Sequence, residues 1–244
     1  MNPSTIAIVI PVYNEATNIE RNLDAIQQGI NDCKAIFTVN IVYDFAEDTT
    51  LAVIARICKK YTFPLHLIEN KAGGVCNAIK TGLSQAQGDY LLVTMADMSD
   101  DYSVLPLMVD KANDGFDIVC GSRFMKGGKI HGGPFLKKHI SRWANLSLYF
   151  LTRIPTHDIT NSYKIYRKSF LKNITIESDG GFEIGMEITA KAFIKGYKIA
   201  EIPSQWWDRT IGQSRFRLDR WLSKYLRWYG FLISYRISSG LIPK

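Results

Sequence analysis

Short apolar runs alternate with amphipathic segments along the first half of this 244-residue chain. The runs have the length and composition of β-strands, and they lie at residues 5–10, 36–43, 65–69, 91–93 and 117–123. Between them the apolar residues recur with helical spacing, as they do at Ile19, Leu23 and Ile26. Strands that alternate with helices in this way predict an α/β fold with a mostly parallel, Rossmann-like sheet and helices on both faces.

The pattern changes after Arg123. Residues 126–134 (KGGKIHGGP) are rich in glycine and lysine, which indicates a flexible loop. Beyond it we expect a helix ending near residue 151, a strand near 163–167, a helix near 182–195 and a strand at 198–202. From Phe216 the sequence has the pattern of an amphipathic helix. We therefore expect one domain over residues 1–215 and an amphipathic helical tail over residues 216–244.

A cluster of carboxylates follows the fourth apolar run. Residues 91–93 (LLV) have the composition of a buried central strand, and Asp97, Asp100 and Asp101 come shortly after it. Open α/β sheets bind their ligands at the carboxyl ends of their strands. Several acids at such a position favour a positively charged ligand, for which a divalent metal ion is the first candidate. Asp100 and Asp101 are also suited to capping the helix that follows, because acidic side chains are favoured at helix N-termini.

The chain carries an excess of basic residues, with a formal charge of +7 and a sequence pI near 9.1. This balance favours an anionic partner, which could be a phosphate-bearing substrate, an acidic lipid or a nucleic acid. The basic residues form two groups: Lys126, Lys129, Lys137, Lys138 and Arg142; and Arg209, Arg215, Arg217, Arg220, Lys224 and Arg227. Either group alone is compatible with an ordinary solvated surface. We do not expect nucleic acid to bind, because aromatic side chains do not interleave the basic residues on a strand face.

The cysteines, Cys33, Cys58, Cys76 and Cys120, lack the spacing of metal ligands and lie in apolar or helical stretches. They predict reduced thiols in the core of a cytoplasmic protein. The chain enters a strand almost at its first residue, so no signal peptide is expected. No run of about 18 apolar residues is present, so we expect no membrane-spanning helix and at most a peripheral attachment to the inner face of the membrane.

Several short motifs occur at or after the predicted strand ends. They are PVYNE at 11–15, YDFAEDTT at 43–50, MADMSDD at 95–101, GSRF at 121–124, SRWAN at 141–145, DITNSYK at 158–164, FEIGME at 182–187 and EIPSQWWDRTIGQSR at 201–215. In this order they resemble the motifs of the family-2 glycosyltransferases with the GT-A fold, and the chain is most similar to the dolichyl- and polyprenyl-phosphate sugar synthases. The resemblance covers about residues 5–216. It implies an inverting transfer of a sugar from a nucleotide diphosphate sugar to a polyprenyl phosphate or other lipid-linked acceptor.

The resemblance assigns the loops of the first half of the chain to the donor. The family's donor-binding positions correspond here to Pro11, Tyr13, Glu15, Asp44, Asp97, Arg209 and Arg215. Asp97 matches the catalytic carboxylate of the Asp-x-Asp signature that binds Mg²⁺ or Mn²⁺. Arg209 and Arg215 match the basic pair that meets the donor diphosphate, with Arg215 standing where lysine is usual.

Two positions depart from the family pattern. Met95 replaces the first aspartate of Asp-x-Asp, and Tyr43 replaces one of the two aspartates usual after the second strand. A thioether is a poor ligand for Mg²⁺ or Mn²⁺, which prefer oxygen. Asp97 is thereby left as the sole family metal ligand, and Asp100 and Asp101 are the candidates to compensate.

The resemblance assigns the second half of the chain to the acceptor. Arg123, Lys137 and Ser141 fall where the polyprenyl-phosphate synthases bind the acceptor phosphate, with Lys137 in place of an arginine. Lysine offers a point charge and loses the bidentate geometry of arginine. A lipid phosphate is already anionic near neutral pH and needs no strong general base. For a hydroxyl acceptor, Asp158 is the candidate to take the proton, so Arg123 and Asp158 are the expected catalytic residues of this half.

Two other functions stay open at this point. The chain could transfer a sugar to a saccharide hydroxyl in polysaccharide assembly. It could also be a non-catalytic nucleotide-sugar-binding protein, which Met95 and Tyr43 favour.

Two helical segments also have two interpretations each. The tail places Trp221, Tyr225 and Trp228 at helical spacing beside a basic face, so it could cover the core or lie on a membrane surface. Glu183 and Glu187 lie one helical turn apart and could be an exposed pair or part of the site.

Overall fold

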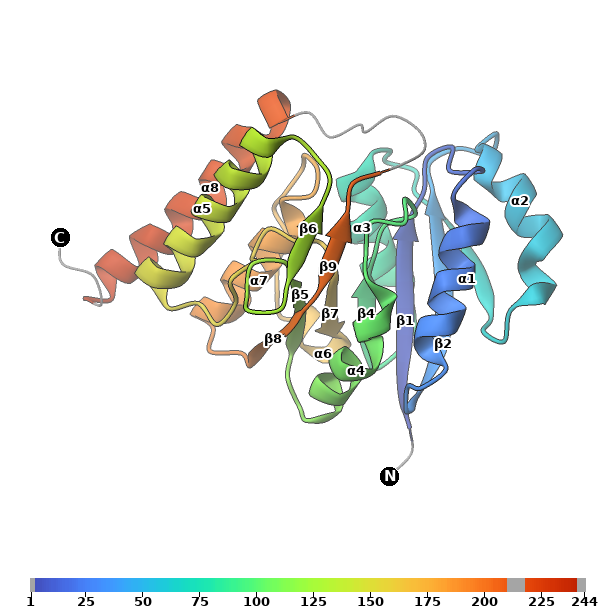
Figure 1. Cartoon of the computed structure of the whole chain (residues 1–244), viewed down its shortest axis with the longest axis horizontal. Helices are drawn as coiled ribbons and strands as arrows, with labels where there is room; N and C mark the ends of the chain where they lie inside the picture. Colours follow the sequence, from blue (N-terminus) through green and yellow to red (C-terminus); the bar gives the residue numbers. More distant parts are fainter. Residues whose placement is uncertain (1–2, 210–217, 241–244) are drawn as a thin grey trace.

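The computed structural model describes residues 3–209 and 218–240. Its centre is a seven-stranded sheet with the strand order β3-β2-β1-β4-β7-β5-β8 (Figure 1). The strands are β1 (Ser4–Pro11), β2 (Ala35–Tyr43), β3 (Leu65–Glu69), β4 (Tyr90–Val93), β5 (Ile118–Ser122), β7 (Lys164–Arg167) and β8 (Ile199–Pro203). The sheet is mostly parallel, as predicted. The exception is β7, which runs antiparallel between β4 and β5.

Helices cover both faces of the sheet, which the sequence also predicted. The helices of the described residues are α1 (Ile19–Ile30), α2 (Thr49–Ile57), α3 (Val75–Gln85), α4 (Leu105–Asn113), α5 (Phe135–Thr152), α6 (Lys168–Leu171), α7 (Ile184–Ile194) and α8 (Leu218–Ser238), with 3-10 turns η1 (Cys58–Lys60) and η2 (Tyr102–Val104). Alternate residues of β1 point to opposite faces: Ile6 and Ile8 pack with residues of α1, α2 and α4, whereas Ala7 and Val9 pack with residues of α3 and α7. Because both faces are buried, β1 is a continuous apolar run.

A second, two-stranded sheet lies where the sequence predicted a loop. It pairs β6 (Lys129–His131) in parallel with β9 (Gln205–Trp207), and Figure 1 shows it in front of the central sheet, beside α5. The loop prediction was therefore wrong over residues 129–131. Its glycine content marks turns correctly, but the pairing is with a segment far along the chain, which local composition cannot reveal.

The C-terminal helix α8 packs beside α5 (Figure 1) and against α7. Trp228 and Leu232 are buried in a cluster with Leu148 of α5 and Met186 of α7. Of the aromatic residues predicted to lie on one face of this helix, Trp228 therefore covers the protein's own core. The proposed boundary between residues 215 and 216 lies outside the described residues, so the division into a domain and a tail stays a prediction.

The basic face of α8 is partly paired within the protein. Lys224 Nζ lies 2.8 Å from Asp179 Oδ1, and Arg227 Nη2 lies 2.5 Å from Glu177 Oε2. These contacts tie α8 to the loop that precedes α7. The cysteines are all free thiols, as predicted, but Cys58 is exposed because it lies in η1, beyond the buried face of α2.

Candidate active site

The predicted donor residues that the structure describes gather at one edge of the central sheet. The parallel registers place Pro11 beside Val42 and Val9 beside Val93, so β1, β2 and β4 end at the same edge. The loops that carry residues 11–15, Asp44 and Asp97 leave the strands there. The sequence therefore predicted the position of this cluster correctly, since parallel strands share one carboxyl edge.

The loop after β1 is fixed to the start of α2. Asn14 has a left-handed backbone (φ 54°), its N–H donates to Asp48 Oδ2 at 2.9 Å, and its Oδ1 accepts from Thr49 N at 3.1 Å. Asp48 also caps α2 by accepting from Thr50 N at 2.8 Å. Asn14 lies in the predicted donor loop of residues 11–15 but was not singled out, and Asp48 was not predicted as a site residue. The sequence signal for Asp48 was its place before Thr49-Thr50, which is typical of a helix N-cap.

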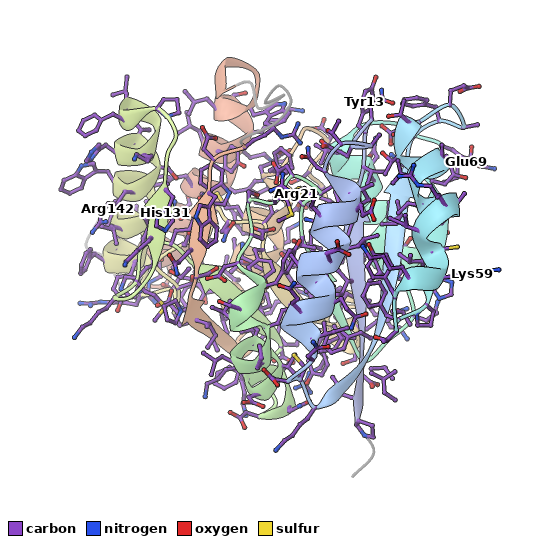
Figure 2. The ribbon with its side chains drawn as sticks, turned by 45° about the vertical axis from the view of Figure 1, so that its right-hand side comes forward. Tyr13, Arg21, Lys59, Glu69, His131 and Arg142 are labelled. Atoms are coloured by element: carbon purple, nitrogen blue, oxygen red, sulfur yellow. The ribbon has the colours of Figure 1, made fainter. Side chains whose placement is uncertain are left out.

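Asp44 organises the loop between β3 and α3. Its carboxylate accepts from Asn70 Nδ2 at 2.7 Å and from Gly74 N at 2.8 Å. Gly74 has φ 83°, a conformation that favours glycine. Nearby, Tyr13 packs edge-on against Phe45 with ring centroids 5.2 Å apart, and Figure 2 shows Tyr13 at the rim of the molecule. An aromatic side chain and a fixed carboxylate thus border the edge where a nucleotide is expected.

Glu15, Asp97 and Arg209 meet at this edge. Arg209 Nη2 donates to Glu15 Oε1, and Arg209 Nε lies 3.6 Å from Asp97 Oδ2. Asp97 Oδ1 accepts from Ser99 N at 3.2 Å, which ties the carboxylate to the backbone just beyond Met98, a residue with φ 64°. The structure therefore brings together three predicted donor residues from the loops after β1, β4 and β9.

Asp100 and Asp101 are engaged with the protein itself. Asp100 is buried and accepts from Thr94 Oγ1 at 2.7 Å and Met95 N at 3.2 Å. Burial raises the pKa of Asp100 to about 7, and the nearby charge of Asp97 adds to the effect. Asp101 caps η2 through Ser103 N at 3.1 Å. In the part of the chain that the structure describes, no group of three or more His, Cys, Asp or Glu side chains is arranged to hold a metal ion.

A cavity of about 590 Å³ opens beside Asp97. It lies between α1, η2 and the end of β9, and its lining includes Arg21, Trp207 and Asp208. Figure 2 shows Arg21 near the middle of the molecule, at the upper part of α1 in that view. The carboxylate of Asp97 therefore borders a space that can admit a ligand.

Arg123 and Asp158 form a bidentate ion pair. Arg123 Nε donates to Asp158 Oδ2 at 2.6 Å, and Nη2 donates to Oδ1 at 2.8 Å. The main-chain N–H of Arg123 donates to Oδ2 as well, at 3.0 Å. Asp158 is fully buried, and its two oxygens hold the guanidinium in one orientation. This geometry gives Asp158 a positioning role toward Arg123, while the acid–base role stays a prediction.

Thr160 and Asn145 link Arg123 to α5. Arg123 Nη2 donates to Thr160 Oγ1 at 3.3 Å, and Asn145 Nδ2 donates to the same oxygen at 2.8 Å. Asn145 Nδ2 also donates to the carbonyl of Ser141 at 2.8 Å, so Ser141 lies one turn from this network. Hydrogen bonds of Thr160 and Asn145 thus connect Arg123 with Ser141. Arg123 and Ser141 were predicted as acceptor residues, whereas Thr160 and Asn145 were not predicted individually. The side chain of Lys137 and all of Arg215 lie outside the described residues.

Glu183 and Glu187, and likewise His157, prove to be internal anchors. Glu183 accepts from the N–H groups of residues 180 and 181, and Glu187 accepts from those of residues 177 and 178. Both are fully buried, so the exposed-pair interpretation was wrong. His157 lies 2.5 Å from Glu201 through Nδ1 and stacks on Tyr149. These residues hold loops around α7 and β8.

Large apolar side chains are exposed along α5 and α8. On α5, Leu136 and Trp143 are 70% and 71% exposed. Further exposed apolar residues of the two helices are Phe135, Ile140, Phe150, Leu151, Leu222, Leu226 and Phe231. Figure 2 shows Arg142 on α5 at the edge of the molecule, on the same helix as Ser141. Among residues 3–209 and 218–240, no helix is long and apolar enough to cross a membrane.

Comparison with known proteins agrees with this geometry. The family model described as Glycosyl transferase family 2 matches residues 7–175. A dolichol-phosphate mannosyltransferase of Pyrococcus furiosus is 30% identical over 237 residues, which cover 92% of this chain but only 64% of that protein. A polyprenol monophosphomannose synthase of Mycolicibacterium smegmatis is 27% identical over 214 residues, covering 85% of this chain and 79% of that protein.

Solved structures share the fold. A glucosyl-3-phosphoglycerate synthase from Mycobacterium tuberculosis, solved with Mn²⁺, UDP and glucosyl-3-phosphoglycerate, has a TM-score of 0.61 at 15% identity, covering 99% of this chain and 81% of that chain. The same enzyme solved with Mg²⁺ and UDP has a TM-score of 0.59. The predicted GT-A fold is therefore confirmed. With the family model matching most of its length, the chain belongs to glycosyl transferase family 2.

Proposed function

We propose that the protein transfers a sugar from a nucleotide diphosphate sugar to a polyprenyl phosphate, with inversion at the anomeric carbon. The observation that carries the choice of acceptor is the guanidinium of Arg123, which Asp158 holds beside α5. A fixed arginine suits a phosphate, and the exposed apolar side chains of the same helix suit a lipid chain. The names of the two curated relatives agree with such an acceptor.

The acceptor phosphate would supply its own nucleophile. A phosphate monoester is largely ionised near neutral pH, since its second pKa is about 6. Its oxygen can therefore attack without a general base. Arg123 would orient that phosphate, with Lys137 and Ser141 from α5 beside it. Asp158 has both oxygens on Arg123, so we assign it to holding the guanidinium in place.

The donor would bind along the edge formed by β1, β2 and β4. Asp44 and the loop of residues 11–15 would hold the nucleotide, and Arg209 would face the diphosphate together with Arg215. Preorganised cations at the leaving diphosphate stabilise the charge that develops there during transfer. Glu15 supports Arg209 in this position.

A divalent metal ion fits this site with the donor present. Mg²⁺ is usually held by one or two carboxylates together with substrate phosphates, and Asp97 is one such carboxylate at the edge of the cavity. The glucosyl-3-phosphoglycerate synthase that shares this fold has been solved with Mn²⁺ and with Mg²⁺. When bound, Mg²⁺ or Mn²⁺ would neutralise charge on the diphosphate.

The exposed apolar side chains of α5 and α8 support a peripheral position on a membrane. A lipid-linked acceptor keeps its chain in the bilayer, so its phosphate lies at the surface. Helices with exposed aromatic and aliphatic side chains and nearby basic residues are suited to that interface. We place the protein in the cytoplasm, at the inner face of the membrane.

Nucleotide release tests the proposal. UDP-, GDP- and other nucleotide sugars are incubated with the protein, Mn²⁺ and either polyprenyl phosphate or a saccharide acceptor. We expect release that depends on polyprenyl phosphate and falls at least a hundredfold in Arg123→Gln, an effect of the size typical for a lost charged contact in a transition state. Arg56→Gln, which changes an exposed arginine on α2, serves as the control. Release with the saccharide alone would favour a hydroxyl acceptor, and binding without release would favour a non-catalytic protein.

A further inference from the structure

Arg209 lies between two carboxylates of the donor site. Nη2 donates to Glu15 and Nε lies 3.6 Å from Asp97 Oδ2, with all three side chains largely buried. A guanidinium stays charged at any physiological pH. In the free protein, Arg209 therefore already compensates the negative charge at the ends of β1 and β4. This is the electrostatic role that a bound cation would have beside Asp97.

The other carboxylates of this edge have partners in the protein. Asp44 accepts from Asn70 and Gly74, Asp100 accepts from Thr94, and Asp101 caps η2. A hard divalent cation needs several oxygen ligands, about six for Mg²⁺. Asp97 supplies at most two. Among the residues that the structure describes, the free protein thus offers too few oxygen ligands for a divalent metal ion, whereas Arg209 already provides a cation for a diphosphate.

Met95 is one reason why the free protein offers few ligands for a metal ion. Met95 lies two residues before Asp97, and it packs against the apolar cluster formed by α3, β1 and their neighbours. Its main-chain carbonyl accepts from Asn22 Nδ2 at 3.0 Å. Neither its side chain nor that engaged carbonyl is a suitable additional ligand for a hard cation.

We propose that Arg209 is the cation to which the donor diphosphate binds first, so that nucleotide diphosphate binds without a divalent metal ion. This inference rests on the proposed function, because it assumes a nucleotide diphosphate donor. Phosphate oxygens match the fork of donors on a guanidinium, which can turn toward them from the carboxylates. Once bound, the diphosphate supplies the oxygens that Asp97 lacks, so metal affinity depends on the nucleotide.

Isothermal titration calorimetry on the full chain tests the order of binding. GDP, UDP and dTDP are titrated in EDTA and again in Mn²⁺, and Mn²⁺ is titrated alone. For the nucleotide that binds, we expect the dissociation constant in EDTA to lie within about tenfold of that in Mn²⁺, a difference of about 1.4 kcal/mol. Mn²⁺ alone should show no saturable binding below about 1 mM.

Two variants separate the contribution of Arg209 to nucleotide binding from the effect of Met95 on metal binding. Arg209→Gln should weaken nucleotide binding in EDTA by at least about tenfold, as expected for the loss of a charge-assisted contact, whereas Arg56→Gln should not change it. Met95→Asp places a second carboxylate near Asp97 and should let Mn²⁺ bind in the absence of nucleotide. Circular dichroism of each variant confirms that it is folded.

Four results would overturn the inference, and the fourth would overturn the proposed function as well. If wild-type protein binds nucleotide only with Mn²⁺, or if Arg209→Gln retains full binding in EDTA, then Arg209 is not the first cation and the proposed function stands. If Mn²⁺ alone binds the wild type at micromolar concentration, the order of binding is wrong. If none of a full set of nucleoside diphosphates binds with or without Mn²⁺, the proposed function fails as well.

Discussion

The two halves of the molecule that we propose for the donor and for the acceptor, here called the donor half and the acceptor half, are built in different ways. The donor half consists of β1 to β4 and their following loops, which Arg209 joins from the end of β9. Its polar residues are held by hydrogen bonds at the carboxyl edge of the sheet, such as those of Asn14 and Asp44. The acceptor half depends on segments far apart in sequence. There, Arg123 meets Asp158, β6 pairs with β9, and α5 packs on α8.

The two halves also differ in what they leave exposed. The donor half packs apolar residues against both faces of the sheet, presents polar side chains at its edge, and leaves only scattered large apolar side chains exposed, such as Ile36, Leu67 and Leu107. The acceptor half exposes large apolar residues on α5 and α8. A nucleotide is a polar ligand, whereas a lipid-linked phosphate is polar at one end only. The difference between the halves matches the difference between the two proposed substrates.

The largest expected effect concerns the ion pair of the acceptor half. Asp158→Asn keeps the size of the side chain but leaves Arg123 without its counter-charge in a largely buried position. We expect a loss of about 3–5 kcal/mol in the free energy of unfolding, measured by urea denaturation, because breaking a buried pair leaves an uncompensated charge.

A matched control uses the exposed pair of Lys111 and Asp114, 3.2 Å apart on α4 and just beyond it. Asp114→Asn should change the free energy of unfolding by no more than about 0.5 kcal/mol. Equal effects of the two substitutions would show that Arg123 does not depend on Asp158 for its position.

The next effect is a pH dependence at the donor edge. Since burial raises the pKa of Asp100 to about 7, the folded protein keeps a proton that the unfolded chain, with an ordinary pKa of about 3.9, has released. Stability is therefore expected to fall as the pH rises from 5 toward 7.5, by about 2–3 kcal/mol. Asp100→Asn should remove this part of the slope. Urea denaturation of both proteins without metal, at several pH values, measures it; identical slopes would contradict the prediction.

The contrast between the halves also explains what the sequence could predict. Strands, helices and the cluster of Glu15, Asp44 and Asp97 followed from local patterns, because parallel strands end at a common edge. Antiparallel β7, the β6–β9 pair and the engagement of Arg123 by Asp158 depend on partners that no local pattern specifies. The burial of Glu183 and Glu187 was missed for the same reason, since their partners are main-chain N–H groups of a loop.

Vesicle binding tests the exposed surface of the acceptor half. Leu136 on α5 is 70% exposed and Leu107 on α4 is 52% exposed, so the same substitution can be compared in the two halves. Leu136→Ser should weaken binding to vesicles that contain anionic lipid by about tenfold, because a leucine contributes about 1.5–3 kcal/mol when it leaves water. Leu107→Ser should have no effect. Binding is measured as the fraction of protein that sediments with the vesicles. An equal fraction for both variants would show that α5 does not lie on the membrane.

The smallest effect concerns the loop after β1 in the donor half. Asn14 combines φ 54° with an Oδ1 that accepts from Thr49 N. Asn14→Ala loses the hydrogen bond and places alanine in a left-handed conformation, so we expect a loss of about 1 kcal/mol in the free energy of unfolding. Asn14→Gly loses only the bond and should cost less, because glycine adopts this conformation without strain. Urea denaturation compares the two. If alanine and glycine cost the same, the hydrogen bond alone holds this loop; if glycine restores the wild-type value, the backbone conformation does.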